Sequence, residues 1–161
     1  MIYLQISDAL NIEADSLLGR LSEEETSFLQ RAAAEALNLA SDVPQADLTL
    51  VLADDAQLQD LNHQFLGVDA PTDVLSFPAG ETDVDSESLY LGDVIISYPR
   101  AQEKAAAGGH SVKDELQLLV VHGVLHLLGF DHGNRDERAV MWAKQAEVLS
   151  SLGSSVTAPP Q

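Results

Sequence analysis

The sequence predicts an α+β fold in which a small, mixed four-stranded sheet carries helices packed mainly on one face. Segments with the alternation of strands and segments with the periodicity of helices follow one another in the order βαβαββααα. One helical segment near residue 120 is apolar on nearly all sides, so we expect a helix buried at the centre of the domain. The length of 161 residues suits one domain, which we expect over residues 1–152, followed by a disordered tail over residues 153–161.

The beginning of the chain predicts one strand and one helix. Residues 1–7 (MIYLQIS) alternate apolar and polar side chains, as a half-buried strand does. Ser22 and Glu25 have the spacing of a capping box, in which two side chains accept hydrogen bonds from free N–H groups at a helix start. The alanine-rich segment that follows predicts a helix to about Leu39.

A second strand and a second helix come next. Residues 47–53 (DLTLVLA) are rich in strand-forming apolar residues. Asp54 or Asp55 is placed to cap the following helix, because a carboxylate there accepts a hydrogen bond from the first helical turn. We expect this helix to continue to about Phe65, since apolar residues recur on one of its sides.

Two further strands are expected to pair with each other. Residues 74–77 predict a short strand that ends at Pro78. The acidic segment 79–88 lacks large apolar residues and predicts an exposed loop. Residues 89–97 (LYLGDVIIS) predict the fourth strand.

The last third of the chain predicts three helices. Pro99 suits the first turn of a helix, and the glycines at 108–109 interrupt it. A long helix then begins near Val112, and a final helix extends from about Arg135 to Leu152.

Three of the five histidines lie in the segment 122–132 (HGVLHLLGFDH). His122 and His126 are four residues apart, so on a helix both imidazoles project from one face. Gly129 suits a left-handed turn at the helix end, after which the chain can return His132 to the other two. Three nitrogen ligands with a fourth position left open describe a catalytic zinc site, and the spacing is that of the long zinc-peptidase motif. The sequence therefore predicts one zinc ion.

The residue after the first histidine separates this chain from the zinc peptidases. They carry a glutamate there as general base, whereas this chain has Gly123. We therefore expect the three histidine ligands of a metal without the glutamate that serves the peptidases as base. Either a zinc-activated water acts unaided, or another residue accepts the proton.

The composition excludes several classes of protein. The chain has 26 Asp and Glu against 8 Lys and Arg, a formal net charge of −18, which argues against loose, sequence-independent binding of nucleic acid. Solubility or a salt-adapted host is the more ordinary cause of such an excess. There is no cysteine, which fits a reducing compartment, and no stretch has the length of a signal or membrane segment. We expect a cytoplasmic protein without a membrane partner.

Three segments together resemble a known family: VHGVLHLLGFDH at 121–132, PTDVLSFP at 71–78 and LGDVIIS at 91–97. They occur in the order found in the YbeY family, bacterial zinc-dependent endoribonucleases of ribosomal RNA maturation, and the likeness spans roughly residues 45–150. The resemblance implies an α+β fold and one zinc ion held by His122, His126 and His132. It also implies RNA as substrate and association with the small ribosomal subunit and its proteins.

The chain departs from the family pattern at Leu66. Before PTDVLSF the family often has LNxxFRG, and this chain reads LNHQFLG. An arginine near the metal would hold a phosphate or stabilise charge that develops on it, and a leucine does neither. His63 or Arg100 are candidate substitutes, although a surface histidine near a helix end is an equally good reading of His63.

Asp93 is a further candidate catalytic residue. A carboxylate among the apolar residues of the fourth predicted strand is costly unless it has a partner, such as a zinc-ligating imidazole, or accepts a proton near the metal. A structural role in capping a turn competes with this reading. Asp131 is expected to orient an imidazole or shape its turn, Thr72 and Asp73 to fix the entry to the third strand, and Ser76 is a candidate to face the cleft.

We therefore expect a single zinc hydrolase domain, a single-strand endoribonuclease in ribosomal RNA maturation and small-subunit quality control, with His122, His126, His132 and Asp93 as its catalytic residues. Two alternatives stay open. One is a non-catalytic, zinc-containing ribosome assembly factor, which Leu66 favours. The other is a zinc hydrolase of another substrate such as a peptide, which Gly123 disfavours.

Overall fold

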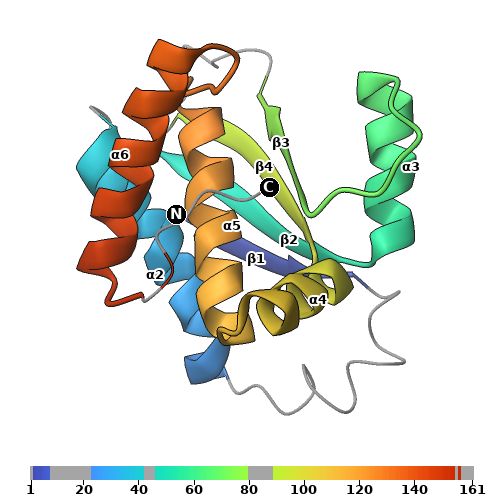
Figure 1. Ribbon diagram of the computed structural model, residues 1–161, viewed down its shortest axis with the longest axis horizontal. Coiled ribbons are helices and arrows are strands. Elements are labelled where there is room, and N and C mark those ends of the chain that lie inside the picture. Colours follow the sequence, from blue (N-terminus) through green and yellow to red (C-terminus); the bar gives the residue numbers. More distant parts are fainter. Residues whose placement is uncertain (1, 8–22, 42–45, 80–88, 155, 157–161) are drawn as a thin grey trace.

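A four-stranded mixed sheet forms the frame of the molecule (Figure 1). The computed structural model describes residues 2–7, 23–41, 46–79, 89–154 and 156. The strands are β1 (Ile2–Ile6), β2 (Asp47–Ala53), β3 (Val74–Pro78) and β4 (Tyr90–Ser97), in the spatial order β1-β2-β4-β3. Strand β2 pairs in parallel with β1 on one side and with β4 on the other, and β3 pairs with β4 in the antiparallel direction. The predicted mixed sheet of an α+β fold is confirmed.

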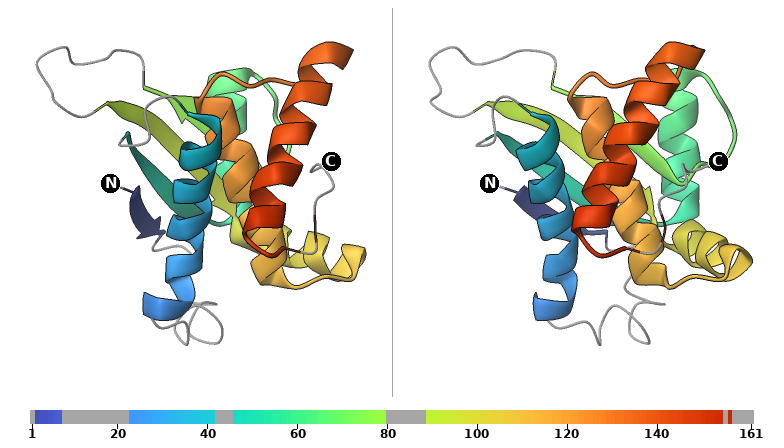
Figure 2. Two further views of the ribbon diagram at one scale, coloured as in Figure 1. Left: turned by 90° about the vertical axis from the view of Figure 1, so that its left-hand side faces the viewer. Right: turned by 60° about the vertical axis from the view of Figure 1, so that its left-hand side comes forward.

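Five described helices surround the sheet in the predicted order. They are α2 (Glu23–Ala40), α3 (Asp55–Leu66), α4 (Tyr98–Gly108), α5 (Val112–Leu127) and α6 (Arg135–Ser151). Helices α2, α5 and α6 lie together on one side, with α5 between α6 and the sheet, while α3 lies on the opposite side (Figure 2). The prediction of helices mainly on one face is therefore confirmed, with α3 as the exception.

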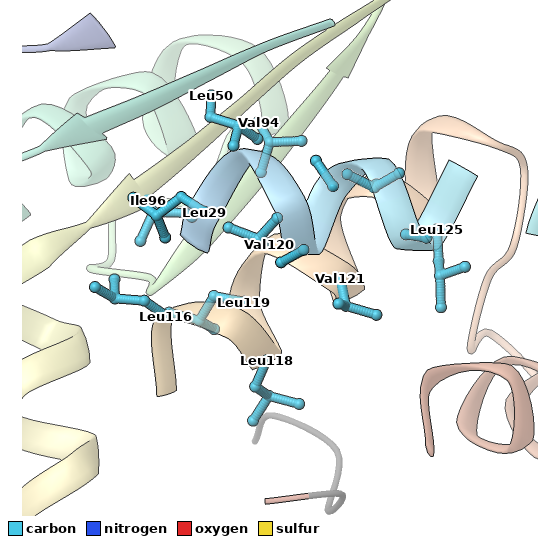
Figure 3. Packing of buried hydrophobic residues seen from close by; sticks show 14 of the residues in the cluster. Leu29, Leu50, Val94, Ile96, Leu116, Leu118, Leu119, Val120, Val121 and Leu125 are labelled. Atoms are coloured by element: carbon cyan, nitrogen blue, oxygen red, sulfur yellow. The ribbon is translucent and has the colours of Figure 1, made fainter. Parts of the chain in front are cut away.

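The strands divide their side chains between these two sides. Alternate side chains of β2 and β4, such as Leu50, Val94 and Ile96, are fully buried in the main core beneath α5 and α2 (Figure 3). Ile95 and Leu75 point the other way and pack with Leu58 of α3 in a smaller cluster. Helix α5 is buried almost throughout, as its apolar sequence predicted.

Helix caps fix most of the boundaries. Asp54, not Asp55, caps α3, and Gln57 completes a capping box by accepting from the Asp54 N–H. Ser97 caps α4 with a proline in its first turn, Ser111 caps α5 and Asn134 caps α6. Each cap satisfies an N–H group that has no partner within its own helix.

Some predictions fall outside the described residues. They include the capping box, because Ser22 and the side chain of Glu25 are not described, and also almost all of the acidic loop at 79–88 and most of the tail. Within the tail, Val156 packs against the main core. In the part of the chain that the structure describes, no helix combines the length and apolar character needed to cross a membrane.

Candidate metal centre

Helix α5 and the turn after it supply the three histidines. His122 and His126 are one turn apart on α5. Gly129 then adopts φ 98°, a conformation that side chains with a Cβ rarely take, and its N–H donates to the carbonyl of His126. The Phe130 N–H donates to the carbonyl of Leu125 at 3.0 Å, which closes the helix end. The turn thereby returns His132 to the other two imidazoles, as the sequence predicted.

The ring nitrogens of the three histidines converge. One ligand nitrogen from each lies within 4.8 Å of the others, and the Nε2 atoms of His122 and His126 are 3.1 Å apart. Nitrogens that bind one zinc ion tetrahedrally at 2.0–2.1 Å are separated by roughly 3.3 Å, so the cluster fits a single ion. His122 is buried, His126 is half-buried and His132 is exposed, so the cluster opens to solvent on the His132 side.

The surroundings favour the neutral imidazoles that bind metal. Burial, and then the neighbouring His126 and His132, lower the pKa of His122 from 6.5 to about 4, and the hydrogen bond with Gln145 opposes this only in part. Burial and His132 also lower the pKa of His126. A metal must displace protons from its ligands, so imidazoles that are already neutral favour binding near neutral pH.

A cleft of about 440 Å³ opens over the histidines. Its opposite wall comes from the segment PTDVLSFP: Thr72, Asp73, Val74, Leu75, Ser76 and Pro78. Leu66 completes the wall from the end of α3 and is 62% exposed. The position at which the chain departs from the family pattern therefore borders the candidate metal centre.

Two polar contacts secure this wall. The Ser76 hydroxyl donates to the carbonyl of Gly123 at 2.9 Å and so joins β3 to α5. Asp73 is largely buried, and its carboxylate accepts a hydrogen bond from Lys104 of α4 at 2.6 Å. Thus Ser76 does line the cleft, as expected, and Asp73 anchors the start of β3.

The structure does not bring Asp93 to the histidines. Asp93 pairs with Phe77 in the sheet, and both belong to the face that packs toward α3, whereas the neighbouring Val94 meets α5. Its carboxylate accepts a hydrogen bond from the Tyr90 hydroxyl at 2.5 Å. The sheet thus separates Asp93 from the cluster, and its catalytic role stays a prediction that this position does not support.

Two other expected site residues also lie apart from the cleft. Arg100 donates from Nε and Nη2 to the two carboxylate oxygens of Asp55, each at 2.9 Å, and this contact lowers the pKa of Asp55. Its guanidinium is therefore committed to the start of α3. His63 is exposed on α3 and is not among the residues that line the cleft. Asp131 accepts from the His132 N–H at 2.8 Å and shapes the turn.

Gly123 occupies a place with no room for a side chain. A Cβ at this position would lie 2.4 Å from Cγ1 of Val94 and 3.3 Å from Oγ of Ser76. The position that carries the general base in zinc peptidases therefore points at the sheet here, and a glutamate would collide with β4.

Two site residues on α6 were missed from the sequence. Gln145 is fully buried, and its Oε1 lies 3.0 Å from Nδ1 of His122. The Trp142 ring centroid is 5.9 Å from that of His122 and 5.5 Å from that of His132. The available signal was a glutamine on the apolar side of the last helix, but nothing in the local sequence shows that this side faces the histidines.

Comparison with known proteins agrees with the family resemblance of the three sequence segments. A family described as "Endoribonuclease YbeY" matches residues 13–153. A protein named Endoribonuclease YbeY from Pelotomaculum thermopropionicum is 46% identical over 142 residues, which cover 85% of this chain and 93% of that protein. A relative of the same name from Geobacillus kaustophilus is 40% identical over 83% of this chain and 90% of its own. Another, from Desulfitobacterium hafniense, is 40% identical over 89% of this chain and 96% of its own.

Proposed function

Because the chain belongs to the YbeY endoribonuclease family, we propose that it cuts single-stranded RNA with one zinc ion held by His122, His126 and His132. As an endoribonuclease it is an enzyme that acts on RNA. The observation that carries the proposal of zinc is the convergence of three imidazoles at the floor of an open cleft. Three nitrogen donors with a fourth position facing solvent are the ligand set of catalytic zinc.

The proposed site needs residues that bind the metal and residues that form the walls of the cleft. The three imidazoles would hold the ion, and Gly129 shapes the turn that delivers His132. Bound there, zinc supplies Lewis-acid chemistry for hydrolysis of a phosphodiester. Leu66 and the PTDVLSFP segment form the opposite wall, so the RNA backbone enters between that wall and the histidines. The Ser76 hydroxyl holds the two walls together through its bond to α5.

The proposal also covers the extent of the domain, the RNA substrate, the partners and the cellular compartment. We propose that residues 1–152 act as one zinc hydrolase domain, because helices from both halves of the chain share the main core. Ribosomal RNA is the proposed substrate, within small-subunit maturation and quality control, and the subunit's proteins are the proposed partners. This substrate places the proposed activity in the cytoplasm. The support is membership of the family.

Leu66 keeps a second function open, that of an assembly factor that binds zinc but does not cut. The cleft wall offers a leucine where a phosphate would gain from a cation. A peptidase function has less support, because the position of Gly123 has no space for a glutamate.

The test begins with metal content and then compares cleavage. Protein purified without chelator and resupplied with zinc should hold about one equivalent, and His126→Ala should lose it. The wild type should cut single-stranded ribosomal RNA, chelator and His126→Ala should abolish the cutting, and an unfolded protein substrate should stay intact. His63→Ala is the matched control, since it removes an exposed histidine away from the cleft.

Each alternative gives its own result. Less than about a tenth of an equivalent of metal would refute the metal site. Zinc binding without cleavage of an RNA that a relative cuts would favour the assembly factor. Zinc-dependent cleavage of the protein substrate would favour the peptidase.

A further inference from the structure

Gln145 is a fully buried polar side chain behind the histidine cluster. It lies on α6, 0% exposed, and its amide Oε1 is 3.0 Å from Nδ1 of His122. The amide Nε2 is also buried and has no hydrogen-bond partner among the residues that the structure describes. A buried amide that is half satisfied costs about 1–3 kcal/mol, so a leucine or methionine of similar volume would serve the core better. The presence of glutamine is explained by its contact with His122.

The direction of this hydrogen bond decides which ring nitrogen of His122 keeps a free lone pair for a metal. An amide oxygen only accepts, so Nδ1 of His122 carries the hydrogen and donates it. In the neutral imidazole the lone pair then lies on Nε2, and this is the atom that lies 3.1 Å from Nε2 of His126 within the cluster. With the amide reversed, the hydrogen of His122 would sit on Nε2 and block the lone pair there.

Helix α6 therefore supports the cluster from behind. Trp142 is three residues before Gln145, on the same side of α6, and its ring packs against both His122 and His132. The tryptophan limits where the rings can move, while the glutamine fixes which nitrogen is free. The two contacts act on different properties of the same imidazole.

We propose that Gln145 is a positioning residue of the metal centre, which holds His122 in the tautomer with a free Nε2. The inference rests on the proposed function in one respect, namely that the histidines bind a metal. Residues that orient a ligating imidazole in this way typically change metal affinity by about 10–100-fold when they are removed.

The first test measures zinc affinity by competition with a chromophoric chelator. Gln145→Leu should bind zinc about 10–100-fold more weakly than the wild type. Gln117→Leu is the matched control, because Gln117 is a second buried glutamine, on α5, and the same change there should leave zinc affinity unaltered. A Gln145→Leu variant with wild-type affinity would overturn the positioning role. A wild type that binds no zinc would instead contradict the proposed function.

The second test needs no variant and no metal. Two-bond proton–nitrogen correlation spectra of the wild type, labelled at histidine and kept metal-free at about pH 8, report which ring nitrogen carries the hydrogen. His122 should show hydrogen on Nδ1 alone. Hydrogen on Nε2, or an even mixture of the two tautomers, would overturn the inference even if Gln145→Leu failed to fold.

Discussion

Leu66 is the residue at which a single substitution should improve the enzyme. It lines the cleft with the three histidines and is 62% exposed. In Leu66→Arg, a guanidinium at this place would contact a phosphate as charge develops on it. Because the site is exposed, solvent limits the gain to about 1–2 kcal/mol, so we expect roughly a tenfold increase in the rate of single-stranded RNA cleavage.

The same charge placed outside the cleft provides the control for Leu66→Arg. Val68 is 49% exposed and is not among the cleft-lining residues, so Val68→Arg should leave the rate nearly unchanged. Rates should be compared at equal zinc occupancy and fixed salt. Equal acceleration by both variants would mean that net charge, rather than a contact in the cleft, limits the reaction.

His122 should make the metal-free protein sensitive to mild acid. Its pKa in the folded chain is about 4, against 6.5 in an unfolded one, so the unfolded chain binds the extra proton first. The stabilising contribution is complete above about pH 6.5 and is lost as the pH falls toward 4, by about 3 kcal/mol in total.

Urea unfolding at a series of pH values in this range measures the effect of His122. The variant His122→Asn should lose less stability than the wild type over the same interval, while His63→Ala should match the wild type. Parallel pH profiles for the wild type and His122→Asn would contradict the expectation.

The sequence predicted the cluster of three histidines because their arrangement is local. His122, His126 and Gly129 act within one helix and its final turn, so spacing alone places them. Gln145 was missed, and the position of Asp93 on the face away from the histidines was not foreseen, because both depend on which side of an element meets α5. Strand alternation places Asp93 and Val94 on opposite faces, but it does not say which face carries the histidines.

Helix α5 and strand β4 approach each other closely at Gly123. A Cβ there would lie 2.4 Å from Cγ1 of Val94, well inside contact distance. Gly123→Ala should therefore destabilise the protein by about 1–3 kcal/mol, although alanine is by nature the better helix former by about 1 kcal/mol. Chemical denaturation measures this difference in the free energy of unfolding.

A double-mutant cycle tests the cause of that loss. In a Val94→Ala background the colliding methyl is absent, so Gly123→Ala should cost little or even stabilise the protein. An equal cost in both backgrounds would show that the two positions do not interact and that the close approach is not the reason for the glycine.

At the level of elements, the order and type of the helices and strands followed from the sequence. Periodicity and caps are local signals, which is why Asp54, Pro99 and the glycine after α4 appear where the pattern places them. The spatial order β1-β2-β4-β3 did not follow, since it depends on contacts between strands tens of residues apart. The placement of α3 alone on the second face is likewise a matter of tertiary packing.

The whole molecule carries a formal net charge of −18, and RNA is a polyanion. Among the described residues that line the cleft there is neither lysine nor arginine, so few counterions should leave the RNA on binding. We expect affinity for a short single-stranded RNA to fall only about threefold or less between about 50 and 200 mM salt, the value for one phosphate contact.

Fluorescence anisotropy with the metal-free protein measures this salt dependence without cleavage. Leu66→Arg should make the slope of log affinity against log salt more negative by about 0.7, as one further contact does. A steep slope for the wild type, equivalent to several contacts, would mean that a cationic surface outside the cleft binds the RNA.

The position of β4 inside the sheet has a consequence for synthesis of the chain. Both neighbours of β4, β2 and β3, leave the ribosome before it, so the edge of β2 waits for a partner that is completed 44 residues later, from Ala53 to Ser97. At about 10 residues per second this wait lasts ~4 s, during which an apolar strand edge is open to other nascent chains. The three histidines and Gln145 emerge later still, so the histidine cluster can form only after all four strands have been synthesised. His132 is the exposed member of that cluster, so the proposed ion would enter from its side.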